Sequence, residues 1–457
     1  MQYSSRIGKL LLLVLLASLV QACARTSSTP DLRGTTIVTE TPLPVLATPD
    51  QADSYQLPGI MEGQINVREV NGFSDEFNTW YIYGLISNDT AQWVSDIVIE
   101  IQLLDASGNV LYSDTTNPAI INLAAGESSP FILYTYEPLS GVETIGAQIL
   151  SNGTTSIERA NLEFSGVTLW YDAIFNDVYI AGNVTNTASD PVQVNGIAAS
   201  LHGSDGALES ANTAYPFLYY LNPGVSAPFR VMFDVPPEQG ASYTDYKLYL
   251  DAQLTSPTRT LNLVTSAEHY WYLDAYEKFH LVGTLTNNTE SYLNVRLLAG
   301  IFDDAGNCID VASLYLPVAV SPGTTLPYDF DLWGALDSSQ EANQTATQYE
   351  IFIDWYSTSE AYLKPVPITT QDNTNSFDGY SASFSGNVLN TAGRSLDSAT
   401  VIVSLYDRST GELIATDYTY VSGPIEDGGL LPYTAYLYPQ AEFEPANIEF
   451  TVYAFGQ

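Results

Sequence analysis

The sequence predicts an all-β protein in which four tandem two-sheet sandwiches follow an export signal and a disordered linker. Three observations lead to this fold class. Tyrosine is abundant, with 32 residues against 3 methionines, which favours strands over helices. Apolar residues alternate with polar ones along many short segments. A glycine-containing pattern also recurs about every 100 residues, and a chain of 457 residues has room for about four domains of that size.

The repeats are defined by two short signatures that alternate along the chain. The first is Gly-x-x-x-Asn, found at Gly84 and Asn88, Gly182 and Asn186, Gly283 and Asn287, and Gly386 and Asn390. The second is Gly-x-x-x-Pro followed by Phe or Tyr, found at Gly126–Phe131, Gly224–Phe229, Gly323–Tyr328 and Gly428–Tyr433. Because both recur four times in the same order, we place the repeats at residues 60–155, 156–258, 259–365 and 366–457.

The residues around each first glycine indicate which side of its strand is buried. Trp80, Ile82 and Ile86 all lie an even number of positions from Gly84, so they share one face of a strand. We expect that face to point into the core, and the glycine to admit the close approach of a packed group. Such strands, separated by Gly, Pro, Asn and Asp turns, predict a sandwich of seven strands in each repeat. A propeller blade is about half as long as this repeat.

One segment in the second conserved strand suggests a family. Val403-Ser404-Leu405-Tyr406-Asp407 resembles the signature of the FxLYD domain, and the segments 101–105 and 299–303 are looser versions of it. The resemblance covers most of residues 60–457. It implies tandem immunoglobulin-like modules of a bacterial envelope protein, with no assigned catalysis and no functional residue to carry over. No copy has the leading Phe of the family signature, and the second copy lacks the acidic residue.

The first 22 residues have the features of a signal peptide. The basic residues Arg6 and Lys9 precede an apolar run of 11 residues that ends at Val20, and the small residue Ala22 follows. This run is shorter than the about 20 residues that a membrane-spanning helix needs. Val20-Gln21-Ala22-Cys23 resembles the lipobox of bacterial lipoproteins, which implies that Cys23 is lipidated and holds the chain on the extracytoplasmic face of the cell envelope. An ordinary leader followed by an unrelated cysteine is the alternative.

Residues 23–59 are rich in Thr, Ser and Pro, a composition that buries no core. We expect a disordered, extended linker that lifts the repeats away from the membrane.

The charge of the chain restricts its partners. The sequence has 14 basic and 52 acidic residues, and removal of a leader that contains Arg6 and Lys9 would leave 12 basic residues against the same 52 acids. A negative field of this size repels phosphate backbones, so nucleic acid is excluded as a partner. Binding of Ca²⁺ is compatible with the acidity, but no motif in the sequence supports it.

Residues with catalytic potential are few and scattered. His202, His269 and His280 lack metal-binding spacing and occur in no nucleophile motif, so we expect them to be satisfied or solvent-facing. Asp205, Asp303 and Asp304 occupy turn positions, where Asp accepts local backbone hydrogen bonds. Cys308 falls in a hairpin turn, and we expect it near the surface as a free thiol. The sequence therefore predicts no enzyme, no cofactor and no metal site.

The leading hypothesis is a non-enzymatic, lipid-anchored envelope protein whose repeats form a stalk or a protein-binding array. The alternative is carbohydrate or cell-wall binding through exposed aromatic residues, with Trp170 and Trp271 as candidates. Each tryptophan occurs at the same place ahead of the strand that contains the glycine of the first signature, which we call the glycine strand. This equal placement also fits a structural role. A third hypothesis, a hydrolase that uses two of the many carboxylates, has no motif behind it.

Overall fold

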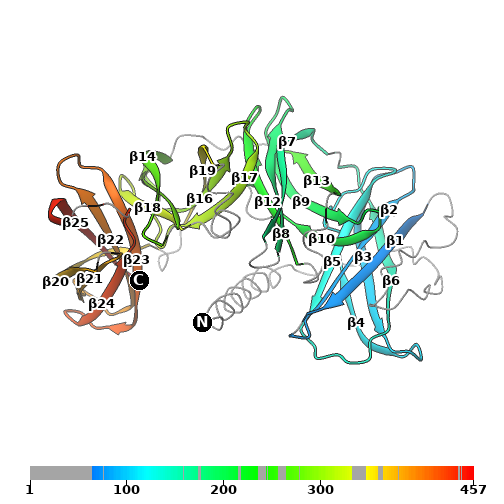
Figure 1. Cartoon of the computed structure of the whole chain (residues 1–457), viewed down its shortest axis with the longest axis horizontal. Helices are drawn as coiled ribbons and strands as arrows, with labels where there is room; N and C mark the ends of the chain where they lie inside the picture. The colour runs from blue at the N-terminus through cyan, green and yellow to red at the C-terminus, as the bar shows by residue number, and fades with distance from the viewer. Residues whose placement is uncertain are drawn as a thin grey trace. The chain divides into compact units, whose positions relative to one another are not determined.

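The structure is a computed structural model that describes residues 64–75, 77–157, 159–172, 177–214, 218–234, 243, 245–255, 264–276, 278–331, 346–358, 364–378, 380–440, 443 and 445–457 (Figure 1). These residues belong to one compact unit. The predicted signal peptide, the lipidation site Cys23 and the linker at residues 23–59 lie outside them.

The described residues form antiparallel β-sheets, which confirms the all-β prediction. The helical element found among them is one short 3-10 helix, Pro445–Asn447. No helix in the described part of the chain has the length and hydropathy needed to cross a bilayer.

The first repeat sets the pattern for the others, with two sheets of three strands. One sheet has the order β1-β2-β5 and the other the order β4-β3-β6. Their bounds are β1 (Ile65–Ser74), β2 (Trp80–Asn88), β3 (Val94–Leu104), β4 (Val110–Thr116), β5 (Ser128–Thr135) and β6 (Thr144–Thr154).

The second and third repeats have the same strand order. The second consists of β7 (Leu162–Asp172), β8 (Asp177–Asn186) and β12 (Ser226–Asp234) in one sheet, and of β9 (Val192–His202), β10 (Leu208–Thr213), β13 (Asp245–Leu254) and the short β11 (Tyr220–Leu221) in the other. The third consists of β14 (Val264–Leu273), β15 (Phe279–Asn287) and β18 (Thr325–Asp331), and of β16 (Leu293–Phe302), β17 (Cys308–Tyr315) and β19 (Gln348–Ser357).

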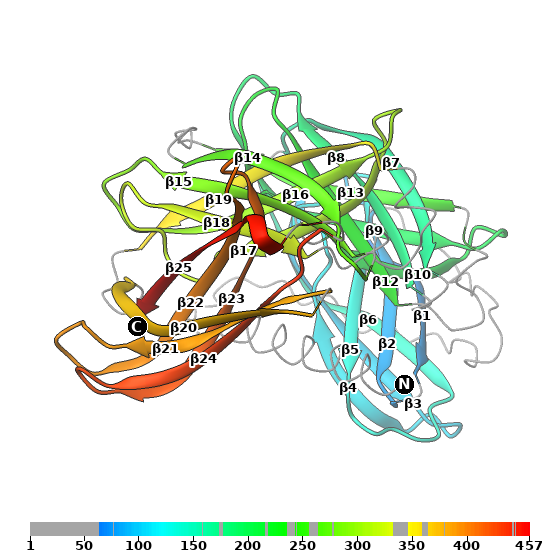
Figure 2. The same ribbon diagram turned by 60° about the vertical axis from the view of Figure 1, so that its left-hand side comes forward.

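In the fourth repeat one strand joins the two layers. Strand β20 (Val366–Phe377) pairs with β21 (Ala382–Leu389) along most of its length and with β25 (Ile448–Gly456) at its start. Strand β24 (Leu430–Leu437) extends the first layer, while β22 (Leu396–Asp407) and β23 (Leu413–Ile425) lie in the second. Figure 2 shows β20, β21 and β24 side by side in this repeat.

Among the described residues the first, third and fourth repeats have six strands each, whereas the second has the predicted seven, one of which is the two-residue β11. The segment between β4 and β5, which corresponds to the position of β11 in the second repeat, makes isolated bridges in the first, such as Val94 with Leu123 and Pro118 with Phe131. In the first repeat it thus contacts both sheets through single bridges, whereas in the second it pairs with β9.

Each repeat has its own apolar core, built from the alternating face that the sequence predicts. Trp80 is 6% exposed, and Ile82 and Ile86 are fully buried in the core of the first repeat. The other three cores are built from the corresponding strands of their repeats. The cores also accept single residues from a neighbouring repeat, such as Ala198 in the first and Leu298 in the second.

The fifth strand of each repeat is an edge strand and carries the proline of the second signature. Pro130, Pro228, Pro327 and Pro432 lie opposite residues of the glycine strand at matching positions. Proline has no N–H to donate to a ladder, so an edge strand is the place where a sheet tolerates it.

Candidate functional site

The glycine of the first signature and the aromatic residue of the second lie side by side on neighbouring strands in every repeat. Gly84 lies directly opposite Phe131 in the ladder, and the other three repeats pair Gly182 with Phe229, Gly283 with Tyr328 and Gly386 with Tyr433 in the same way. A Cβ added to Gly84 would lie 2.2 Å from Cζ of Phe131. The glycine therefore leaves the space that the aromatic ring of the neighbouring strand fills, within the sheet rather than across the sandwich.

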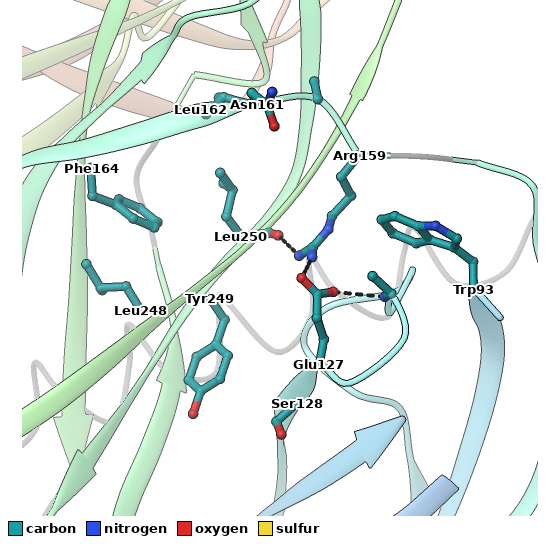
Figure 3. Close-up of a pocket in the computed structure, with 12 residues that line it drawn as sticks. Trp93, Glu127, Ser128, Arg159, Asn161, Leu162, Phe164, Leu248, Tyr249 and Leu250 are labelled. Atoms are coloured by element: carbon teal, nitrogen blue, oxygen red, sulfur yellow. Dashed lines mark hydrogen bonds and ion pairs between the residues drawn. The ribbon is translucent and has the colours of Figure 1, made fainter. Parts of the chain in front are cut away.

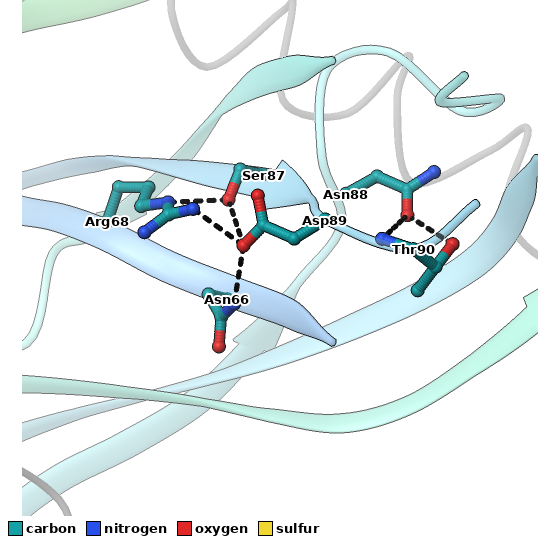
Figure 4. A network of polar contacts seen from close by, with 6 residues as sticks. All are labelled: Asn66, Arg68, Ser87, Asn88, Asp89 and Thr90. Atoms are coloured by element: carbon teal, nitrogen blue, oxygen red, sulfur yellow. Dashed lines mark hydrogen bonds and ion pairs between the residues drawn. The ribbon is translucent and has the colours of Figure 1, made fainter. Parts of the chain in front are cut away.

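The asparagine of the first signature ties the end of the second strand to a distant loop. The Asn88 Nδ2 group donates to the carbonyls of Gln92 at 2.8 Å and Leu123 at 3.0 Å, and its Oδ1 accepts from the Thr90 amide. Figure 4 shows the contacts with Thr90 beside a separate network around Asp89. Asn186, Asn287 and Asn390 make the corresponding hydrogen bonds to a nearby and to a distant backbone carbonyl. The four asparagines therefore have a structural role in their repeats.

The network around Asp89 is local to the first repeat. The Arg68 guanidinium and the Asn66 amide each donate to Asp89 Oδ2 at 2.6 Å (Figure 4). Burial acts to raise the pKa of Asp89, but these donors favour the charged carboxylate more strongly, so the pKa lies below its usual value.

The second face of the glycine strand packs on the next repeat in three places. In the first repeat Tyr83 and Leu85 contact Leu208 and Ala211 of β10. Ala181 of β8 packs against Cys308 and Val311 of β17, and Val282 of β15 packs against Leu413 of β23. The residue just before the glycine thus contacts the fourth strand of the following repeat in every case. We call these contacts the first, second and third junctions.

The first junction adds carboxylates that accept backbone hydrogen bonds. Asp251 is fully buried, and its Oδ2 accepts from the amides of Ile121 at 3.0 Å and Asn122 at 3.1 Å. Glu69 Oε2 accepts from the Leu208 amide at 2.8 Å. These bonds satisfy backbone donors that the contact between the repeats would otherwise leave without an acceptor.

A pocket of about 570 Å³ lies beside the first junction (Figure 3). Arg159 and Glu127 form an ion pair in it, and the Arg159 guanidinium lies 5.6 Å from the ring centroid of Trp93. Arg159 also donates to the Leu250 carbonyl, while Phe164 contributes to the apolar side of the pocket. The two charged groups that line the pocket, Glu127 of the first repeat and Arg159 of the second, are thus paired with each other. We therefore treat the pocket as part of the contact between these repeats.

The second junction contains a buried ion pair. Arg230 Nη1 lies 2.6 Å from Asp310 Oδ1, and the Asp310 side chain is 1% exposed. Burial alone would lower the pKa of Arg230, but the charge of Asp310 outweighs burial and raises it. The Arg230 guanidinium also lies 5.5 Å from the ring centroid of Tyr179. Charge pairing therefore joins the two repeats here.

Cys308 lies in this junction, and the prediction that it is near the surface is wrong. It begins strand β17 directly after the turn, it is fully buried, and it packs with Ala181 and Val311. Burial raises the pKa of its thiol, so the group stays protonated and unreactive while the junction is closed. The sequence locates the turn correctly but contains no sign that a neighbouring repeat covers it.

The third junction uses tyrosine hydroxyls. Tyr272 Oη donates to the Tyr438 carbonyl at 3.0 Å, and Tyr270 Oη donates to the Leu413 carbonyl. His280 lies beneath, with its ring stacked on Tyr272 at 5.0 Å between centroids. Its Nδ1 lies 2.9 Å from Asp329 Oδ2, and its Nε2 lies 3.6 Å from Asp274 Oδ2.

The two tryptophans proposed for carbohydrate binding have packed surroundings. Trp170 lies against the core of the third repeat, and its Nε1 donates to Thr168 Oγ1 at 2.8 Å. Trp271 packs edge-on against Phe279, with 4.9 Å between ring centroids. Both are partly buried, which favours the structural role.

The other two histidines also have partners. His202 is 2% exposed, and its Nε2 lies 2.8 Å from Ser200 Oγ. Burial lowers its pKa, with a further contribution from Lys247. His269 is exposed, with its Nδ1 3.1 Å from the Tyr349 hydroxyl. Within the described residues no group of three or more His, Cys, Asp or Glu side chains is arranged to hold a metal ion.

Asp303 and Asp205 hold turns, as their positions suggest. Asp303 Oδ1 accepts from the amides of Ala305 at 3.0 Å and Asn307 at 2.8 Å. Asp205 Oδ1 accepts from the Ala207 amide at 3.0 Å. The glycines Gly306 and Gly206, which follow in these turns, have φ angles of 82° and 83°, a region that side chains rarely adopt.

No protein-family model and no curated protein match the sequence. Among solved structures, the native conformation of Escherichia coli alpha-2-macroglobulin matches at 10% identity and a TM-score of 0.12, over 85% of this chain and 28% of that one. A Salmonella alpha-2-macroglobulin mutant matches at 10% identity and a TM-score of 0.13, over 86% and 29%. The chain therefore spans less than a third of either macroglobulin. Likeness at these TM-scores carries no argument about function.

Proposed function

We propose that this chain is a non-catalytic, lipid-anchored spacer of the bacterial cell envelope. One observation carries the proposal: in three successive repeats the same face of the glycine strand packs on the fourth strand of the next repeat. Each contact buries apolar side chains and adds polar bonds that cross the junction. Repeats joined in this way resist independent rotation, as a spacer requires.

The spacer is tested by scattering from the mature chain that starts at residue 23 and carries Cys23→Ser. A single globule of this length would have a radius of gyration of about 22 Å. We expect a clearly larger value. We also expect Val282→Asp, which puts a charge into the third junction, to broaden the distribution of distances while the β-sheet signal in circular dichroism is unchanged. A radius near that of one globule would contradict the proposal.

The anchor is tested separately on cells that express the full chain. With Cys23 intact, the protein should partition into the detergent phase, because lipid chains on one residue bind firmly to membranes. Cys23→Ser should move it to the aqueous phase, whereas Cys308→Ser, at the buried cysteine, should leave it in the detergent phase. Detergent partitioning that survives Cys23→Ser would rule out this anchor.

A further inference from the structure

The face that packs on a neighbour in the first three repeats carries partly or fully exposed side chains in the fourth. Tyr83 is 4% exposed, and Ala181 and Val282 are fully buried, each at the position before the glycine. Ser385 occupies this position in the fourth repeat and is partly exposed. We call this surface the open face; its residues are Thr374, Ser376, Ser383, Ser385, Asn387, Thr434, Tyr436 and Tyr438.

Hydroxyl groups line up across the three strands of the open face. Ser376 Oγ of β20 lies 2.8 Å from Ser383 Oγ of β21, and Ser385 Oγ lies 3.0 Å from Thr434 Oγ1 of β24. Each hydroxyl has one donor and two acceptor sites, so these pairs leave capacity for a ligand. The apolar contact surface of the other repeats is thus replaced by a regular polar one.

Tyrosines gather along one margin of the same face. Tyr436, on β24, is 54% exposed, and Tyr438, directly after the end of that strand, is 38% exposed. Tyr380, at the tip of the hairpin between β20 and β21, is 58% exposed, and its ring lies 5.9 Å from that of Tyr276, which is also 6.0 Å from Tyr438. Such a group of exposed aromatic rings exceeds the single exposed side chains that are normal on a protein surface.

The hairpin holds Tyr380 in place before any ligand arrives. Asp378 Oδ1 accepts from the amides of Tyr380 at 2.9 Å and Ser381 at 2.7 Å. These bonds fix the backbone on both sides of the turn. A turn whose backbone is fixed in advance loses less conformational entropy when its side chain binds a ligand.

The chemistry of the open face selects one class of ligand. Aromatic rings stack on the apolar faces of sugar rings, while hydroxyl and amide groups exchange hydrogen bonds with sugar hydroxyls. Asp378 lies in the hairpin turn beside Tyr380, and the chain as a whole carries a net charge of −38, which disfavours anionic polymers. A protein interface would instead need an apolar centre, which Ser383 and Ser385 do not supply.

We propose that the open face binds a neutral polysaccharide, with Tyr380, Tyr436 and Tyr438 stacking on sugar rings and the serine and threonine hydroxyls hydrogen-bonding to it. The site goes beyond the spacer role and does not depend on it. It also differs from Trp170 and Trp271, which pack against cores.

Affinity electrophoresis of the mature chain with Cys23→Ser tests this site. The gels contain dextran, mannan or a mixed-linkage β-glucan, with alginate as the anionic comparison. We expect at least one neutral polymer to retard the protein. Tyr436→Ala and Tyr380→Ala should each raise the dissociation constant about tenfold, because exposed tyrosines dominate such contacts. Tyr356→Ala, which removes a tyrosine that is 56% exposed on β19, should change nothing.

Three results would overturn the proposal: no retardation by any neutral polymer, retardation by alginate alone, or retardation that both tyrosine variants leave unchanged. A second pair of variants, Ser383→Ala and Ser385→Ala, removes each hydroxyl and changes nothing else in the side chain, and we expect both to weaken binding. Failure of the glycan site would leave the scattering result untouched, so the two proposals can fail separately.

Discussion

The first and second junctions join equivalent strands but use different polar chemistry. In the first, buried Asp251 accepts hydrogen bonds from two backbone amides. In the second, Arg230 and Asp310 neutralise each other with little access to water. The backbone fold thus determines which strands of neighbouring repeats are in contact, while the side chains determine which interactions stabilise each junction. Junctions of the same geometry should therefore respond differently to substitution and to pH.

The largest effect should follow from Asp310→Ala in the second junction. It leaves Arg230 buried without its carboxylate, a change that costs about 3 kcal/mol in comparable sites. In the Cys23→Ser chain Cys308 is the remaining cysteine, so its reaction rate with a thiol reagent reports opening of this junction. We expect that rate to rise roughly a hundredfold. Asp251→Ala is the matched control, and an equal rise in that variant would remove the distinction between the junctions.

Asp251→Ala should have the next largest effect, confined to the first junction. The substitution leaves the buried amides of Ile121 and Asn122 without their acceptor, which costs about 2 kcal/mol. Hydrogen exchange measured by mass spectrometry should show faster exchange in the peptide that contains residues 119–124. Unchanged protection there would mean that water replaces the carboxylate without loss, and that the first junction is not held by Asp251.

Acidification should lower the stability of the second repeat through the buried His202, which lies near Glu69, Asp245 and Lys247. Its folded-state pKa lies below the usual value near 6.5, so the unfolded chain takes up a proton that the folded chain does not. The free energy of unfolding should therefore fall as pH drops through 6.5 towards the lower folded-state pKa. Denaturant unfolding at pH 7.5 and 5.5 measures this loss, which His202→Gln should reduce. An identical loss in that variant would assign it to other groups.

The smallest effect should come from Asp89→Asn, at an ion pair with the same 2.6 Å separation as that of the second junction. The Arg68 and Asp89 side chains are 29% and 20% exposed, so water screens their attraction. We expect a loss of about 0.5 kcal/mol in denaturant unfolding. A loss as large as that of Asp310→Ala would show that distance, rather than burial, sets the strength of these pairs.

Much of the fold follows from local pattern. The alternation around Gly84 is sufficient to place Trp80, Ile82 and Ile86 in the core, because a strand turns alternate side chains to one face. The burial of Tyr83 and Leu85 on the opposite face could not be predicted in the same way. Those side chains are covered by residues more than 100 positions away, and the period-two rule says nothing about contacts between repeats.

The open face was not identified from the sequence, although the sequence contains a signal for it. A comparison of the four glycine strands shows Tyr83, Ala181 and Val282 at one position and Ser385 at the same position in the last repeat. The change from apolar to hydroxyl marks a face whose serines are partly exposed, and the third repeat contacts it only at the margin among the described residues, where Tyr276 lies beside Tyr380 and Tyr438. The choice of Trp170 and Trp271 rested on residue type alone, and type does not distinguish a ring packed on a core from one in water.

The prolines of the edge strands have a consequence for molecules crowded on a membrane. If tethered chains stand side by side, an unprotected strand edge would let the sheets of adjacent molecules fuse into a growing ladder. Pro130, Pro228, Pro327 and Pro432 each remove one backbone donor from the edge of a sheet. Dense coats of this protein should therefore stay as separate molecules, a property that the second signature preserves in every repeat.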